Sequence, residues 1–65
     1  MITITKVGET NYGKWCLFEY EENNIIISGI AQTTLNNLEE NKKYSNLVLK
    51  VVKKNDKIYY NILTK

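Results

Sequence analysis

Two clusters of aromatic and basic residues are the parts of this sequence that could do chemistry. The first lies in and after a glycine-bounded stretch, residues 8–13, and consists of Tyr12, Lys14 and Trp15. The second lies near the C-terminal end and consists of Lys50, Lys53, Lys54, Lys57 and Tyr59. Aromatic rings can stack on nucleobases and lysines can neutralise phosphates, so the two clusters predict binding of single-stranded nucleic acid.

Both clusters also have a structural interpretation that involves no ligand. Charged side chains on a hairpin prevent edge-to-edge aggregation of sheets, and this role would explain the lysines without any bound ligand. Trp15 could equally fill one end of a small core, because a domain of this size has few large apolar side chains to bury. The sequence leaves the exposure of Trp15 open.

The residue types do not favour catalysis or metal binding. The chain has no histidine and a single cysteine, Cys16, so it lacks the ligands and nucleophile–base pairs that zinc sites and hydrolases use. Most of its glutamates lie within residues 19–22 and 39–40, which have the pattern of solvated surfaces. The segment Gly13-Lys14-Trp15 lacks the ending of a phosphate-binding loop. We therefore expect no enzyme, no metal and no cofactor.

Length and composition indicate one small domain that spans residues 1–65. The chain is globular in composition, with 43% hydrophobic and 25% charged residues, although so short a chain buries only about 60% of the surface that it exposes when unfolded. No apolar run reaches the roughly 18 residues of a membrane span, and residues 1–5 do not have the pattern of a secretory signal. With one unpaired cysteine, these features favour a cytoplasmic protein that does not enter membranes.

Alternation of apolar and polar residues predicts five strands separated by turns. In the second strand, Cys16, Phe18 and Tyr20 are expected on one face, with Trp15 and Leu17 on the opposite face. The third strand is rich in β-branched residues, which predicts burial on both of its faces. The expected strands are residues 2–7, 14–21, 25–30, 46–54 and 57–63.

The last two strands form a hairpin whose register can be predicted. Asn55 and Asp56 tolerate positive φ, so a two-residue turn places Lys54 opposite Lys57. Like charges that face each other in a hairpin commonly lower its stability by about a few tenths of a kcal/mol, and a bound anion would relieve this repulsion. The remaining predicted pairs are Val51–Tyr60 and Leu49–Ile62 on one face, and Val52–Tyr59 and Lys50–Asn61 on the other.

One short helix is predicted between the third and fourth strands. Thr33 or Thr34 can cap its N-terminus, and Leu35 and Leu38 lie three residues apart on one side. The two lysines that follow Asn41 suit the negative end of the helix dipole.

This order of elements resembles the OB-fold, and the chain is similar in this respect to small single-stranded-DNA-binding proteins of phages and mobile genetic elements. The resemblance covers the whole chain and rests on element order and spacing. It implies a mainly β fold, a small five-stranded OB-like barrel with one short helix between strands 3 and 4. Ligands of OB-folds contact strands 2 and 3 and the loops between strands 1–2 and 4–5. These loops, residues 8–13 and 53–57, hold or adjoin the two clusters. A three-stranded meander with a helix and a C-terminal hairpin is the alternative fold.

The resemblance implies a non-catalytic module that binds single-stranded nucleic acid, DNA in the first place, during replication or recombination of a phage or mobile element. All nine cations are lysines, which argues against reading base sequence in a duplex groove. A net charge of +2 is modest for such a protein, so a homo-oligomer or a replication-protein partner would strengthen binding. The alternative is a protein-binding accessory subunit of a replication enzyme such as a DNA polymerase, or an inhibitor of a host protein. Its interface anchors would be Trp15, Leu17, Val52 and Tyr59.

Overall fold

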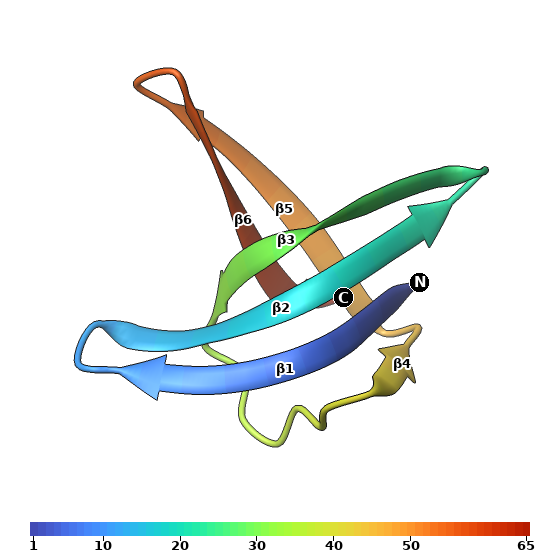
Figure 1. Cartoon of the computed structure of the whole chain (residues 1–65), viewed down its shortest axis with the longest axis horizontal. Coiled ribbons are helices and arrows are strands. Elements are labelled where there is room, and N and C mark those ends of the chain that lie inside the picture. The colour runs from blue at the N-terminus through green and yellow to red at the C-terminus, as the bar shows by residue number, and fades with distance from the viewer.

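Six strands form a single sheet in the computed structural model, which describes residues 1–65 (Figure 1). In the sheet they lie in the order β4-β1-β2-β3-β6-β5, and only the pairing of β3 with β6 is parallel. The β5–β6 hairpin crosses β3 steeply, so the tips of the β2–β3 and β5–β6 hairpins lie far apart (Figure 1). The strands are β1 (Ile2–Thr10), β2 (Gly13–Glu22), β3 (Ile25–Thr33), β4 (Lys42–Tyr44), β5 (Leu47–Lys54) and β6 (Lys57–Thr64).

The core lies on one face of this sheet, here called the inner face. Its members come from β1, β2, β3, β5 and β6, so the sheet must curl around them, and the start of β5 approaches β1. Only eight of 65 residues are buried, which is a small core even for a chain of this length. The buried apolar residues are Ile2, Ile4, Cys16, Phe18, Ala31, Leu47 and Ile62.

The face assignment of the second strand is confirmed. Cys16 and Phe18 are buried and Tyr20 is half-buried, while Leu17 is 37% exposed on the opposite side, here called the outer face. In β1 the register shifts between Ile4 and Lys6, so the alternation is not regular. Such a bulge re-aims the side chains that follow it. Here it turns Val7 toward the core and leaves Lys6 exposed.

The predicted register of the last hairpin is confirmed in every pair named above. Asn55 and Asp56 both adopt positive φ, at 51° and 63°, which is the geometry that a two-residue hairpin turn requires. Asn23 and Asn24 make the same kind of turn between β2 and β3, at 50° and 67°. The first turn is shorter than the six residues expected, because β1 and β2 pair as far as Thr10 and Gly13.

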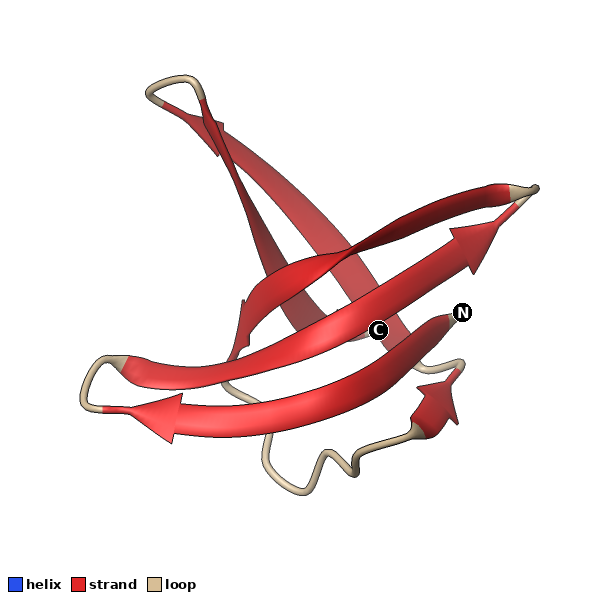
Figure 2. Ribbon diagram, in the orientation of Figure 1, coloured by secondary structure: helices blue, strands red, loops and turns tan.

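The predicted helix is absent, and Figure 2 shows only strands and loops. Asn37 and Asn41 have φ of 67° and 61°, which a right-handed helix cannot contain. This segment is hydrogen-bonded to β1 instead, once through its backbone and once through a side chain. Asn41 N donates to Ile4 O at 2.7 Å, and Val7 N donates to the carboxylate of Glu40 at 3.0 Å. Leu35 and Leu38 pack on the core from a loop, so their spacing of three did not indicate a helix.

Two further expectations of the sequence are wrong. The sheet is open and has six strands, because the segment expected to end a helix continues as β4 and pairs with the start of β1. The first half of β3 is not buried on both faces: Ile25, Ile26 and Ile30 are 60%, 67% and 59% exposed. That half pairs with β2 alone, because β6 joins β3 only from Ala31 onward. No helix of the structure could span a membrane.

Candidate nucleic-acid interface

A row of four side chains crosses the outer face from β2 to β5. Trp15 lies opposite Gln32 of β3, Gln32 opposite Asn61 of β6, and Asn61 opposite Lys50 of β5. Residues directly opposite one another project from the same face of a sheet. Neighbouring strands lie about 4.8 Å apart, so the row spans about 14 Å. We call these four residues the outer row. Across the sheet it presents, in this order, an aromatic ring, two amides and a cation.

Trp15 begins the outer row and lies against Gly8 of β1. The two residues are cross-strand partners, and an added Cβ at Gly8 would meet Trp15 Cζ2 at 2.2 Å. Only a residue without a side chain leaves this space for the indole ring. The tryptophan is therefore half-buried on the outer face, neither in the core nor fully exposed.

An open groove of about 600 Å³ runs beside the outer row. It is bounded by the β1–β2 turn and the start of β2, by the second half of β3, and by β6. Tyr12 at the turn is fully exposed and Tyr59 is 45% exposed. The apolar part of the lining consists mainly of Ile30, Ile58 and Leu63. We call it the outer groove.

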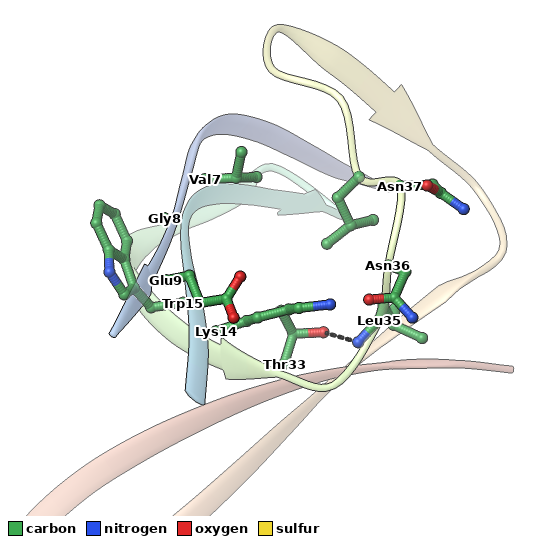
Figure 3. A pocket seen from close by; sticks show the side chains of 10 residues that line it. Val7, Gly8, Glu9, Lys14, Trp15, Thr33, Leu35, Asn36 and Asn37 are labelled. Carbon is green, nitrogen blue, oxygen red and sulfur yellow. Dashed lines mark hydrogen bonds between the residues drawn. The ribbon is translucent and has the colours of Figure 1, made fainter. Parts of the chain in front are cut away.

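Lys14 does not share this face with Trp15. Successive residues of a strand point to opposite sides, and Figure 3 shows the Lys14 side chain extending into a second hollow, with the indole of Trp15 at its rim. This hollow, of about 280 Å³, lies under the loop after β3. The loop is fixed there by Thr33, whose hydroxyl accepts a hydrogen bond from Leu35 N at 3.0 Å (Figure 3). The same hydroxyl donates to Ile62 O, also at 3.0 Å.

The lysines of the last hairpin are divided between its two faces. Lys50, Lys54 and Lys57 belong to the face that carries Tyr59, whereas Lys53 lies opposite Ile58 on the other face. Lys54 and Lys57 face each other at the tip, 43 residues beyond the first turn in sequence and far from it in space (Figure 1). The structure therefore brings Tyr12, Trp15, Tyr59 and Lys50 to one side and leaves Lys53 on the other. Lys14 lies at the boundary, since it lines both the outer groove and the second hollow.

Charge is unevenly distributed over the fold. Residues 47–65 hold five lysines and one aspartate, a formal charge of +4, whereas residues 1–46 hold four lysines and six glutamates, a charge of −2. Glu19 and Glu21 lie at the far end of the outer face of β2, opposite Ser28 and Ile26. An anion on the outer face is therefore attracted toward β5 and β6 and repelled from the β2–β3 tip.

Two residues of the outer row, Gln32 and Asn61, were not singled out from the sequence. The pairing of Lys50 with Asn61 could be predicted from the hairpin, but no local sequence pattern predicts the parallel pairing of β3 with β6. Isolated amide residues such as Gln32 and Asn61 also form no motif that would mark them as binding residues. Only the tertiary pairing places Gln32 beside Asn61.

The remaining titratable contacts lie away from the outer face. Lys42 Nζ donates to Glu39 Oε2 at 2.9 Å, and this hydrogen bond lowers the pKa of Glu39 and raises that of Lys42. The Tyr20 hydroxyl donates to the Glu22 carboxylate, which raises the pKa of Tyr20. Burial raises the pKa of the Cys16 thiol, so it is protonated at neutral pH. No cluster of acidic or cysteine side chains is arranged to hold a metal ion.

Comparisons of the chain with protein-family models, with curated proteins and with solved structures find no match. The site must therefore be interpreted from its own residues.

Proposed function

We propose that the chain is a non-catalytic module that binds single-stranded nucleic acid, DNA in the first place, across its outer face. The observation that carries the proposal is the outer row, which aligns an indole, two amides and a lysine next to an open groove. Rings take up bases by stacking, amides can hydrogen-bond to exposed base edges, and the lysine supplies a phosphate contact.

The strand order supports the same interpretation. An antiparallel β1–β2–β3 meander joined to the β5–β6 hairpin through a parallel β3–β6 pair is consistent with an OB-like arrangement in which the short β4 replaces the helix. In that arrangement the two tight turns, at residues 11–12 and 55–56, flank the ligand. Replication or recombination of a phage or mobile element is the proposed setting, again on the resemblance of the element order.

The charge distribution suggests the path of the strand. Glu19 and Glu21 repel phosphates from the far end of β2, whereas Lys50, Lys54 and Lys57 attract them along the outer side of the last hairpin. A strand would pass from Tyr12 and Trp15 across Tyr59 toward these lysines. Base stacking contributes about 1–3 kcal/mol for each ring, so three aromatic side chains can compensate for a net charge of only +2.

Titration with oligo-dT at low and then moderate salt, followed by Trp15 emission, tests the proposal. Quenching should saturate and should weaken as salt rises, because binding releases counterions from the phosphates. Lys50→Glu should weaken binding about tenfold, which corresponds to about 1.4 kcal/mol. Lys43→Glu, the same charge change on β4, is the matched control and should have little effect.

Two outcomes would contradict the proposal. One is the absence of binding at low salt in both the fluorescence titration and a gel-mobility assay, the second of which detects binding that does not reach Trp15. The other is an equal loss of affinity in the two lysine variants, which would indicate general attraction rather than a site. The second candidate, a protein-binding accessory subunit, is favoured by the apolar lining of the outer groove. Capture of a partner that persists at high salt would support it.

A further inference from the structure

The first half of β3 has a free edge. Ile25–Ile30 pairs with β2 on one side, but β6 joins the other side only at Ala31, so about six residues present their backbone groups to solvent there. Figure 1 shows the reason, since the β5–β6 hairpin diverges from the first half of β3; we call the angle between these two elements the wedge. An unpaired strand edge is a template for another strand.

This edge lacks the protection that the other edges have. The outer edge of β4 carries Lys42 and Lys43, and the edge strand β5 carries three lysines. Charges of this kind prevent strand pairing between molecules. From residue 25 to residue 33, by contrast, β3 contains neither a charged residue nor a proline. Its side chains are also unusually exposed for isoleucines, at 60% for Ile25 and 67% for Ile26.

The charges on either side of the wedge are complementary. The end of β2 beside the free edge carries Glu19, Glu21 and Glu22, and the hairpin on the other side of the wedge carries the lysines of β5 and β6. A second copy whose β3 runs antiparallel to the first would insert its own β2–β3 tip into the wedge. Its glutamates would then face the lysines of the first copy, and the two-fold symmetry would repeat this contact once more.

We propose that the chain forms a symmetric homodimer through antiparallel pairing of the free edges of β3, residues 25–30, of two copies. The pairing satisfies the exposed backbone groups and covers isoleucines that a chain with eight buried residues cannot cover itself. The attraction between the acidic β2 tip and the lysine-rich hairpin fixes the antiparallel orientation. This inference does not rest on nucleic-acid binding, but the two surfaces overlap: Ile30 of the free edge also lines the outer groove, and the partner's glutamates would face the hairpin lysines assigned above to phosphates.

Sedimentation and light scattering of the full chain test the dimer. The wild type should have twice the 7.6 kDa mass of one chain and should dissociate on dilution. Ile26→Lys places a charge on the free edge at a position that is 67% exposed, so the fold should persist. The dissociation constant should rise at least about tenfold. Val48→Lys is the matched control, because Val48 is 41% exposed near the start of β5, at the end of the strand remote from the hairpin tip, and it should leave the dimer unchanged.

A second variant tests the orientation. Glu21→Lys reduces the charge complementarity without touching the backbone edge, so it should weaken the dimer, and added salt should weaken the wild type more than this variant. Circular dichroism and Trp15 emission verify that each variant is folded. Three results would overturn the proposal: a wild type that stays monomeric at up to about 1 mM, the scale of a very weak association; equal losses in Ile26→Lys and Val48→Lys; or open-ended assembly into species larger than a dimer.

Discussion

Replacing Gly8 with alanine is the sharpest test of the outer face, because the three atoms nearest to the added methyl group all belong to Trp15. The new methyl group would lie 2.2 Å from Trp15 Cζ2, 2.4 Å from Cε2 and 2.8 Å from Nε1. Carbon atoms in good contact are about 3.5–4.0 Å apart. The indole ring must therefore move by about 1 Å or more, or the β1–β2 pairing must open at this point.

Overpacking of this kind costs about 1–3 kcal/mol of unfolding free energy. In a domain of 60–100 residues each kcal/mol lowers the melting temperature by about 4–8 °C. Gly29→Ala is the matched control, because the atoms nearest to a methyl group there would be Phe18 Cε1 and Tyr60 Cε2, both at an ordinary 3.8 Å. This variant should be neutral or more stable by about 0.4–1 kcal/mol, since alanine restricts the unfolded chain.

Urea denaturation of both variants, followed by far-ultraviolet circular dichroism and by Trp15 emission, measures these effects. Gly8→Ala should lower the midpoint and shift the emission of the folded protein to the red as the ring moves into water. In the Trp15→Ala background the cost of Gly8→Ala should largely disappear, because the contact that causes it has been removed. If Gly8→Ala behaves like Gly29→Ala, with unchanged emission, Trp15 does not lie against Gly8 and the outer row is wrongly assigned.

Three other predictions concern the loop, the core and the last turn. Thr33→Val should cost about 1–3 kcal/mol in a thermal melt, because it leaves Ile62 O and Leu35 N without their buried partner, whereas Thr33→Ser should retain most of the stability. The pKa of the buried Cys16 thiol is raised above its ordinary value of 9.0, so the folded state keeps a proton that the unfolded state loses. The unfolding free energy should fall as pH rises above 9, less steeply in Cys16→Ala, as urea titrations at several pH values will show. Asp56→Gly should raise the melting temperature slightly, because glycine adopts the φ of 63° at this position without strain; a lower value would contradict the assigned turn.

Local sequence patterns were sufficient to predict strand faces and hairpin register wherever a short segment determines its own structure. The period of two in residues 14–21 predicted which side chains of β2 lie inward, and the Asn55-Asp56 turn fixed every pair of the last hairpin. The loop after β3 could not be predicted in this way. Leu35 and Leu38 have helical spacing, but the hydrogen bonds to β1 that hold the segment in a non-helical path join residues 33 and 37 positions apart in the sequence.

The sequence by itself determined the class of the fold, the faces of its hairpins and the absence of the residues that zinc sites and His-dependent hydrolases require. Tertiary structure decided which hairpins meet. The parallel pairing of β3 with β6 is non-local, and it places Gln32 beside Asn61 and aligns Trp15 with Lys50. The same pairing stops at Ala31, and that is why three isoleucines expected in the core lie at an open edge. Periodicity predicts on which face of the sheet a residue of a strand lies. Which strand pairs with it depends on contacts between residues that are distant in sequence.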